Sequence, residues 1–454
     1  MYNLLQKYNN FFFIGVGGSG MSAIAQYLKG IGKNVAGSDR LFEDKNHSIK
    51  IKLENEGIIC FPQNSNGLTS DFEVVVISTA IENSVPEFKK SKELGLEIIH
   101  RADMLKIISD WKKTIAISGT SGKSTTVAML FHIMQFSGFE PSIISGAGLT
   151  SLQKTGKIGN CFVGCGDWLI IEADESDGTL TKYSPEIGVI LNIEKDHKEF
   201  EELEQIFGTF TKSIKNKIIV NSSNARAKKY SKDENFDFCS ENGFHGSDFK
   251  QTGLDIFFKV KNVDFEIPVA GKHNMENALA AIAVANYLNI SLETCSTALK
   301  TFEGIYRRMQ KIGIKNNVLV IDDYAHNPAK VSAAINACQQ ITQKVIAWFQ
   351  PHGYTPTRFL KNEFISEISD ILRVDDEIWM SEIFYAGGTA VKDISANDLI
   401  EGIKNNNKNA FFVENRIDLP DKIKSHFTDD CILLLMGARD NSLEDFAKYV
   451  FEKI

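Results

Sequence analysis

The sequence has few cysteines for its length, and their spacing follows no known pattern. Its 454 residues include seven cysteines. No two of them stand in a C-x-x-C motif, so neither a disulfide framework nor a zinc site of closely spaced thiolates is indicated. We therefore expect a protein of a reducing compartment, the cytoplasm.

Long apolar runs and an excess of positive charge are also missing. No stretch reaches the roughly 18 to 20 uncharged apolar residues that a membrane helix needs. The 50 lysines and arginines are outnumbered by 58 acids, which gives a formal net charge of -8. A surface of this balance does not favour binding to nucleic acid. We expect a cytoplasmic protein without membrane insertion or a nucleic-acid partner.

The chain instead shows three series in which short apolar runs alternate with amphipathic stretches. This alternation predicts βαβ units and therefore mainly parallel sheets. A length of 454 residues exceeds one compact core. We predict an α/β protein of three domains: a Rossmann-like domain at 1–108, a P-loop ATPase-like domain at 109–309 and a second Rossmann-like domain at 310–454.

The first series contains a glycine-rich turn in "FFFIGVGGSGMSAIAQYLKGIGKNVAGSDR". An apolar strand precedes Gly15, Gly17 and Gly20, and a helix pattern follows them. Such a turn brings backbone N–H groups to a diphosphate at the helix N-terminus. Asp39 ends the next strand, as in NAD-binding domains, so NAD and another phosphate compound both remain possible ligands here.

The second series contains a similar glycine-rich turn, "GTSGKST", at residues 119–125. It resembles a shortened P-loop, in which Lys123 contacts the terminal phosphates and Ser124 reaches a magnesium ion. The alternative is a chance surface turn. Its position between a predicted strand and a predicted helix favours nucleotide binding.

Acidic and polar side chains follow the two neighbouring strands. "IIEADESD" supplies Asp174, Glu175 and Asp177, and "LNIEKDHKEF" supplies Asn192 and His197. Because parallel strands present their carboxyl ends at one edge, these groups are predicted to meet the P-loop as magnesium ligands or site residues. A solvated turn and an ordinary surface histidine are the alternatives.

The third series opens with two polar motifs. "IDDYAHNP" crowds Asp323, His326 and Asn327 between a strand and a helix, and "YRRM" places Arg307 and Arg308 just before it. Arginine suits charge on a transferring phosphoryl group. Helix capping by Asp323 or Asn327 and a solvated arginine pair are the simpler alternatives.

Together these motifs resemble the Mur ligases, the ATP-dependent amide-forming enzymes of peptidoglycan precursor synthesis. "GTSGKSTT", "EADESD", "NIEKDH", "GKHNMENALAA", "YRRMQ" and "DDYAHNP" have counterparts in that family over essentially the whole chain. The resemblance implies a reaction in which a carboxylate attacks the γ-phosphate of ATP, giving an acyl phosphate, and an amine then displaces phosphate. It implies ATP and Mg²⁺ as cofactors.

The resemblance also assigns roles to residues. As catalytic residues it implies Lys123, Glu175, His197, Arg308 and His326, with Ser124, Glu175 and His197 as metal ligands. For ATP it implies Gly119, Thr120, Ser121, Gly122, Lys123, Ser124, Thr125, Asn274, Asn277, Arg308 and Asp323. For a UDP-sugar it implies Gly17, Gly18, Ser19, Gly20, Met21, Asp39, Ser78, Ala80 and Asn192, and for the amino acid Tyr324, His326 and Arg358.

Within the family, the chain is most similar to the branch that joins L-alanine to UDP-N-acetylmuramate. It departs from that branch at Gly353 and Pro356, which replace two arginines near the amino-acid carboxylate. Arg358 remains two residues after Pro356, and Arg439 in "MGARDNS" is a second candidate that would come in from another strand. Another amino acid, a recycled peptide and a non-catalytic nucleotide-sugar sensor are therefore alternatives. An NAD-dependent oxidoreductase is the rival outside the family. We expect a monomer or a weak homodimer.

Overall fold

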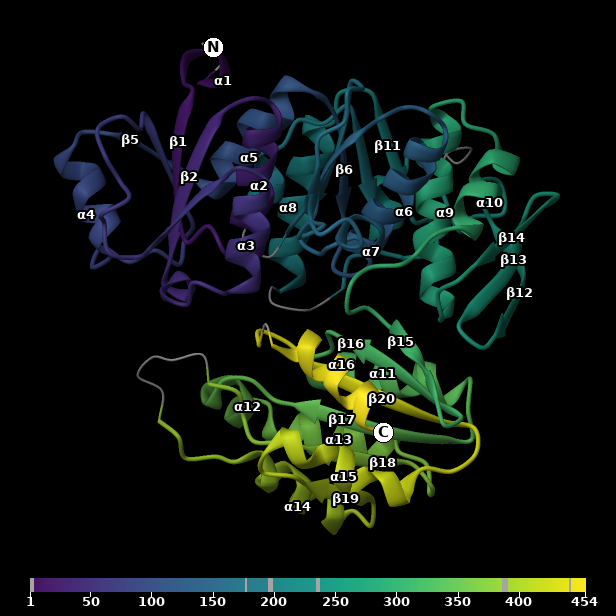
Figure 1. The fold of residues 1–454 in the computed structure, drawn as a ribbon. Helices are drawn as coiled ribbons and strands as arrows, with labels where there is room; N and C mark the ends of the chain where they lie inside the picture. The colour runs from purple at the N-terminus through teal and green to yellow at the C-terminus, as the bar shows by residue number, and fades with distance from the viewer. Residues whose placement is uncertain (1–3, 176–177, 195–198, 234–236, 386–390, 441) are drawn as a thin grey trace. The chain divides into compact units, whose positions relative to one another are not determined.

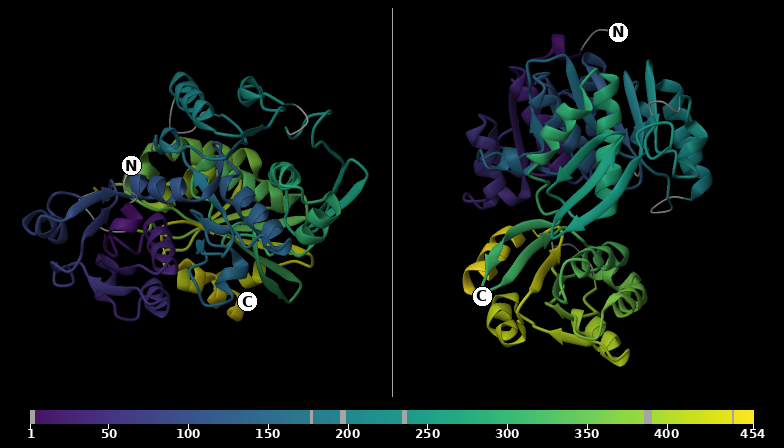
Figure 2. Two further views of the ribbon diagram at one scale, coloured as in Figure 1. Left: turned by 90° about the horizontal axis from the view of Figure 1, so that it is seen from above. Right: turned by 90° about the vertical axis from the view of Figure 1, so that its right-hand side faces the viewer.

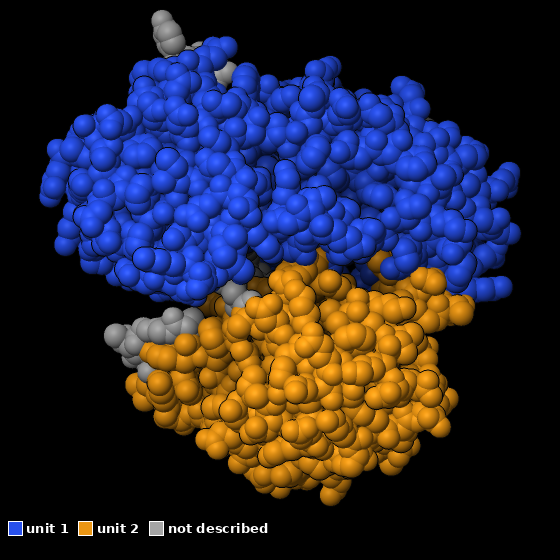
Figure 3. All heavy atoms as spheres, viewed as in Figure 1, with its two compact units in different colours: residues 1–250, 256–268, 272–305 blue, residues 251–255, 269–271, 306–454 orange. Residues whose placement is uncertain are grey.

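The structure is a computed structural model that describes residues 4–175, 178–194, 199–233, 237–385, 391–440 and 442–454. Within these residues, helices cover three mainly parallel sheets, and a small antiparallel sheet accompanies them (Figures 1 and 2). The chain divides into two compact units (Figure 3). The first comprises Met1–Lys250, Ile256–Pro268 and Lys272–Ile305, and the second Gln251–Asp255, Val269–Gly271 and Tyr306–Ile454.

The first unit begins with a five-stranded parallel sheet of order β3-β2-β1-β4-β5. Its strands are β1 (Asn10–Ile14), β2 (Asn34–Asp39), β3 (Ile59–Pro62), β4 (Val74–Ile77) and β5 (Glu97–His100), and its helices are α1 (Leu4–Lys7), α2 (Ser19–Gly30), α3 (Ser48–Asn55), α4 (Pro86–Glu93) and α5 (Arg101–Trp111). In β1, Phe11 and Phe13 face one hydrophobic cluster while Phe12 and Ile14 face another. Burial on both faces explains why this strand is apolar throughout.

A six-stranded sheet of order β11-β10-β6-β9-β7-β8 follows in the same unit. Its strands are β6 (Lys113–Ser118), β7 (Ser142–Ile144), β8 (Cys161–Phe162), β9 (Trp168–Ala173), β10 (Ile187–Ile190) and β11 (Lys217–Val220), and only β8 runs antiparallel to its neighbour. The helices are α6 (Lys123–Phe136), α7 (Thr150–Gln153), α8 (Phe200–Ser213), α9 (Lys272–Tyr287) and α10 (Leu292–Lys300). The small sheet comprises β12 (Gly246–Thr252), β13 (Asp255–Val260) and β14 (Val263–Ile267).

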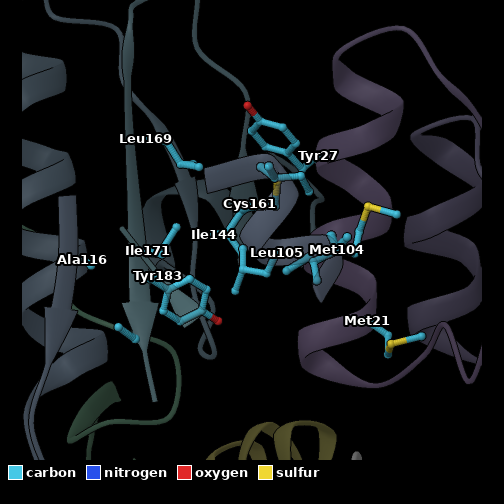
Figure 4. Packing of buried hydrophobic residues seen from close by; sticks show 14 of the residues in the cluster. Met21, Tyr27, Met104, Leu105, Ala116, Ile144, Cys161, Leu169, Ile171 and Tyr183 are labelled. Atoms are coloured by element: carbon cyan, nitrogen blue, oxygen red, sulfur yellow. The ribbon is translucent and has the colours of Figure 1, made fainter. Parts of the chain in front are cut away.

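One hydrophobic cluster extends across the first two sheets. Tyr27 of α2 and Met104 of α5 belong to the same cluster as Cys161 of β8 and Ile171 of β9 (Figure 4). Helix α2 packs directly against β8. The first two α/β series therefore share a core within one compact unit. The predicted boundary after residue 108 lies inside α5, and the domain boundaries stay predictions.

The second unit is built on a six-stranded sheet of order β15-β16-β20-β17-β18-β19. Its strands are β15 (Gln310–Lys315), β16 (Val318–Asp323), β17 (Lys344–Gln350), β18 (Glu377–Met380), β19 (Asn409–Phe412) and β20 (Cys431–Gly437); β15 pairs antiparallel with β16, and the other pairs are parallel. The helices are α11 (Pro328–Gln339), α12 (Tyr354–Phe359), α13 (Lys361–Ile371), α14 (Ala396–Asn405), α15 (Leu419–Ile423) and α16 (Leu443–Lys453). Successive β20 residues alternate between two clusters, one shared with α11, α13 and α14 and the other with α15 and α16. The predicted α/β class is confirmed.

Candidate functional site

The loop between β6 and α6 has the backbone of a phosphate-binding turn. Gly119 has a φ of +140° and Gly122, which precedes α6, has a φ of +86°. A Cβ atom on Gly122 would lie 2.3 Å from Oδ1 of Asn277, and one on Gly119 would lie 2.9 Å from Cβ of Leu191. Both positions therefore require glycine. The loop leads into the N-terminus of α6, where the helix dipole favours a bound anion.

Lys123, the first residue of α6, is held as a charged group in this loop. Its Nζ donates to the carbonyl oxygen of Gly119 at 2.7 Å and to Oε2 of Glu175 at 2.8 Å, and Oδ1 of Asp174 lies 3.6 Å away. Burial opposes the charge on Lys123, but the two carboxylates outweigh it and raise its pKa. Burial likewise raises the pKa of Glu175, against the effect of Lys123. A cation is therefore fixed at the helix N-terminus, where Ser124 and Thr125 complete the first turn.

Three asparagines surround the same loop. The side-chain amide of Asn192 bonds to both backbone groups of Ser121. It accepts from the N–H at 2.8 Å and donates to the carbonyl oxygen at 3.1 Å. Asn277 of α9 accepts from Thr126 at 3.4 Å and donates to Asn274 at 3.0 Å. Sequence reasoning assigned Asn192 to the UDP-sugar and the other two to ATP. The structure groups all three at the loop between β6 and α6, and their ligands stay predictions.

The structure describes only part of the predicted metal site. Asp177 and His197 lie outside the described residues. Asp174 and Glu175 directly follow β9, as predicted, and Glu175 is buried. In the described part of the chain, no group of three or more His, Cys, Asp or Glu side chains is arranged to hold a metal ion.

The glycine loop after β1 is braced by Asp39. Oδ2 of this carboxylate accepts from the N–H of Gly17 at 2.9 Å, and Oδ1 accepts from Leu41 at 3.0 Å. A Cβ atom on Gly17 would lie 2.9 Å from the same Oδ2, so the loop fits closely around the carboxylate. Gly18 precedes α2, which begins at Ser19. The residues predicted to bind the UDP-sugar lie along the carboxyl edge of this sheet, because Ser78 and Ala80 follow β4 at the same edge.

Arg101 lies at the first glycine loop, and sequence reasoning did not single it out. It begins α5, and its guanidinium lies against the first turn of α2: a Cβ atom on Gly20 would lie 3.1 Å from Nη1 of Arg101. Asn160 also reaches this turn, because its Nδ2 donates to the carbonyl oxygen of Ser19 at 2.8 Å. A cation beside a helix N-terminus suits a diphosphate. Arginine at 101 was visible in "RADML", but its contact with a loop 80 residues earlier was not.

In the second unit, Asp323 fixes the turn that carries Arg308. Its carboxylate accepts from the N–H groups of Met309 at 2.7 Å and Ala325 at 2.8 Å. The guanidinium of Arg308 lies 5.4 Å from the ring centre of Tyr324. The two motifs "YRRM" and "DDYAHNP" are thus adjacent in the structure. Both carboxylate oxygens of Asp323 have backbone partners, and its predicted contact with ATP stays a prediction.

His326 is a neutral imidazole with one nitrogen engaged. Its Nδ1 lies 3.0 Å from the carbonyl oxygen of Tyr324. A carbonyl only accepts, so Nδ1 carries the proton and Nε2 keeps its lone pair. Burial, against the effect of the Tyr324 carbonyl, lowers the pKa of His326. Asn327 caps α11 by accepting from the N–H of Lys330, which is the simpler role foreseen for it.

Arg358, predicted for the amino-acid site, has other partners. Its guanidinium pairs with Asp393 and donates to the carbonyl oxygen of Val391 at 3.0 Å. About two fifths of its side chain is exposed. The structure therefore engages Arg358 with the segment before α14, and its contact with an amino acid stays a prediction.

Comparison with known proteins identifies the family. Three family models match the chain. The model described as "Mur ligase family, catalytic domain" matches residues 10–112, the "Mur ligase middle domain" matches residues 117–285, and the "Mur ligase, glutamate ligase domain" matches residues 307–439. The UDP-N-acetylmuramate–L-alanine ligase of Dictyoglomus turgidum is 32% identical over 94% of this chain and 93% of its own length. That of Carboxydothermus hydrogenoformans is 33% identical with the same coverage.

The chain belongs to the Mur ligase family. The three-domain fold expected from the resemblance is confirmed, because a UDP-N-acetylmuramate–alanine ligase from Thermotoga maritima superposes with a TM-score of 0.81 at 24% identity over 98% of both chains. A murein peptide ligase from Psychrobacter arcticus gives a TM-score of 0.68 at 20% identity, again over 98% of both chains.

Membership also settles the reaction class. This Mur ligase is an ATP-dependent ligase, so the oxidoreductase alternative is wrong. The first glycine loop, taken alone, favoured NAD as strongly as any other diphosphate. In the part of the chain that the structure describes, no helix is both long enough and apolar enough to cross a membrane.

Proposed function

We propose that this Mur ligase joins L-alanine to the carboxylate of UDP-N-acetylmuramate, with conversion of ATP to ADP and phosphate. The observation that carries the proposal is the pair of glycine loops in one compact unit, each with its own cation, Lys123 at α6 and Arg101 at α2. Two phosphate-containing ligands need two such sites. The curated relatives with this substrate pair align over more than nine tenths of the chain.

The loop around Lys123 is suited to the ATP step. In the proposed reaction, a carboxylate oxygen of the sugar attacks the γ-phosphorus, the bond to the β,γ-bridging oxygen breaks, and an acyl phosphate forms. Charge accumulates on the phosphoryl oxygens during this transfer. Lys123, held 2.7 Å from a loop carbonyl and beside the N–H groups of α6, supplies positive charge that needs no rearrangement.

The residues near Lys123 also fit a magnesium ion. Mg²⁺ prefers oxygen ligands, and the hydroxyl of Ser124 with the carboxylates of Asp174 and Glu175 provides hard oxygen donors in this neighbourhood. These donors are few, so we propose that the ion is held jointly by the protein and the nucleotide phosphates. It would neutralise charge on the phosphoryl oxygens.

For the second unit we propose roles in charge neutralisation and in attack by the amine. Arg308 lies on a turn fixed by Asp323 and supplies a guanidinium for phosphate oxygens. His326 is neutral and keeps the lone pair of Nε2, so it is able to accept a proton from the amine as the amide bond forms and phosphate leaves.

The proposal is tested by incubating the chain with UDP-N-acetylmuramate, ATP, Mg²⁺ and single amino acids. We expect L-alanine to give stoichiometric ADP, phosphate and an amide product detected by mass spectrometry. Phosphate release with L-alanine no faster than without an amino acid would contradict the assignment. Faster turnover with another amino acid or a peptide would move it to another acceptor, and binding without any turnover would favour a sensor.

Replacing Arg101 with alanine is expected to raise the KM for the nucleotide sugar about 10- to 100-fold, since a charged hydrogen bond to a phosphate oxygen is lost. The KM for ATP should stay within about twofold, because ATP uses the other loop. Lys106→Ala is the matched control, because Lys106 lies on the same helix and pairs with the exposed Asp110. Steady-state kinetics with each substrate varied would measure the effect. Equal KM values for the two variants would show that Arg101 does not bind the diphosphate.

A further inference from the structure

Two histidines and one arginine follow the carboxyl ends of three neighbouring strands in the second unit. Strand β20 pairs with β16 on one side and β17 on the other, and Met436 is the register partner of both Asp323 and Phe349. His326 follows β16, His352 follows β17 and Arg439 follows β20. Parallel strands present their carboxyl ends at one edge of the sheet, so these three residues lie along the same edge. Arg439 follows the middle strand, between the two histidines.

The charge of Arg439 reaches both imidazoles. The rings of His326 and His352 lie 5.8 Å apart. Burial and then the positive charge of Arg439 lower the pKa of His352 to about 4, and Arg439 also contributes, after burial, to the lowered pKa of His326. One exposed guanidinium and two neutral rings therefore share this edge of the sheet.

The position of Arg439 is defined by the loop on which it stands. Its φ of +62° is left-handed, a conformation that non-glycine residues adopt rarely. The next residue, Asp440, is buried and pairs with Arg416 and Ser442. The loop is thus anchored on one side of Arg439, while the guanidinium itself is exposed.

This group of side chains complements an amino acid. The largest electrostatic effects on His326 come from cations, namely Lys330, Arg308 and Arg439. Nδ1 of His352 is buried and has no hydrogen-bond partner among the described residues. Such an environment attracts a carboxylate to the guanidinium and offers imidazole lone pairs to an amine. Arg358, the other arginine considered for this role, pairs with Asp393.

We propose that Arg439 binds the carboxylate of the incoming amino acid and thereby sets the specificity for a free α-carboxylate. The proposal rests on the function proposed above. The amine of the same molecule then lies beside the rings of His326 and His352, whose spacing of 5.8 Å allows one small molecule to contact both. Arg439 is a substrate-binding residue here, and the two neutral imidazoles position the amine.

The test compares L-alanine with L-alaninamide, which has no carboxylate. Arg439→Gln is expected to raise the KM for L-alanine about 100-fold, at tenfold per 1.4 kcal/mol, with kcat within about threefold and the KM values for ATP and the sugar unchanged. Wild type should strongly prefer L-alanine to the amide, whereas the variant should use both about equally. Arg439→Lys should restore part of the preference.

Lys404→Gln is the matched control, because Lys404 is an exposed cation of the same unit that pairs with Glu401 on its own helix. Its KM for L-alanine should stay within about twofold of wild type. Arg439→Asn serves as a second variant, because asparagine tolerates the left-handed backbone at this position. If the wild type joins L-alanine to the sugar but Arg439→Gln and Arg439→Asn keep the wild-type KM and the preference for L-alanine, this inference is overturned and the proposed function stands. If the wild type joins no amino acid to the sugar, the proposed function fails, and this inference fails with it.

Discussion

Lys123→Ala is expected to lower kcat for phosphate release about 1000-fold or more, since loss of one preorganised donor to a developing anion commonly costs 100- to 1000-fold. Lys123 carries more than an ordinary donor, because its charge is fixed by Glu175 at 2.8 Å and by the carbonyl oxygen of Gly119 at 2.7 Å. Single-turnover measurement of ADP and phosphate would isolate the chemical step from product release. The KM for the nucleotide sugar should change little.

A matched control separates chemistry from folding. Lys112 is a part-buried lysine of the same unit, and its Nζ donates to the carbonyl oxygen of Gly166 at 2.8 Å. Lys112→Ala should keep activity within about threefold of wild type. Lys123→Ala with activity within tenfold of wild type would remove the assignment of the ATP loop.

The alanine substitution also leaves Glu175 without its partner. An unpaired buried carboxylate destabilises a protein by about 1–3 kcal/mol or more. The double variant Lys123→Met with Glu175→Gln removes both charges and should recover much of the melting temperature. It should remain inactive, because neither methionine nor glutamine supplies a cation. Recovery of stability without recovery of activity would assign the kinetic loss to Lys123 itself.

Local patterns predicted the elements around the site well. The apolar strands before each glycine loop, the helices after them and the third α/β series agree with the structure in position. These predictions succeeded because period, glycine and capping signals are local properties of the chain. Asn327, for example, was recognised from sequence as a possible cap before Pro328, and it caps α11.

Contacts between distant segments could not be predicted in the same way. Nothing local indicates that Arg101 lies against Gly20, or that Asn192 bonds to both sides of Ser121. Each of these contacts depends on how strands are ordered in a sheet. In "YRRM", the sequence also gave no means to tell which arginine is buried. The structure distinguishes them, because Arg307 is almost completely buried by its pairing with an aspartate.

Replacement of that aspartate, Asp322→Ala, is expected to destabilise the second unit by about 3–5 kcal/mol, because a buried guanidinium loses its counter-ion. Nε and Nη2 of Arg307 donate to the two carboxylate oxygens of Asp322 at 2.8 and 3.1 Å, and Nη2 also donates to the carbonyl oxygen of Gly437 at 2.9 Å. The two side chains are 6% and 3% exposed. Burial opposes the charge on Arg307, but Asp322 outweighs it and raises its pKa.

The pair also holds the turn that presents Arg308. Arg307 and Met309 both have left-handed φ values, +52° and +47°, which are costly for non-glycine residues. The N–H of Tyr324 donates to the carbonyl oxygen of Arg307 at 2.7 Å and so connects this turn to the end of β16. Loss of the buried pair should therefore reduce activity in the fraction that remains folded, because Arg308 is no longer held at a fixed position.

Urea unfolding followed by tryptophan fluorescence would measure the loss of stability, since Trp348 and Trp379 are buried in the core of the second unit. The control is Asp393→Ala, which breaks the exposed pair with Arg358 and should cost less than about 1 kcal/mol. Combining Arg307→Met with Asp322→Leu replaces the ion pair by apolar groups and should regain most of the stability. Activity should stay low in that double variant if the ion pair positions Arg308. A cost for Asp322→Ala no greater than that for Asp393→Ala would contradict a structural role for the buried pair.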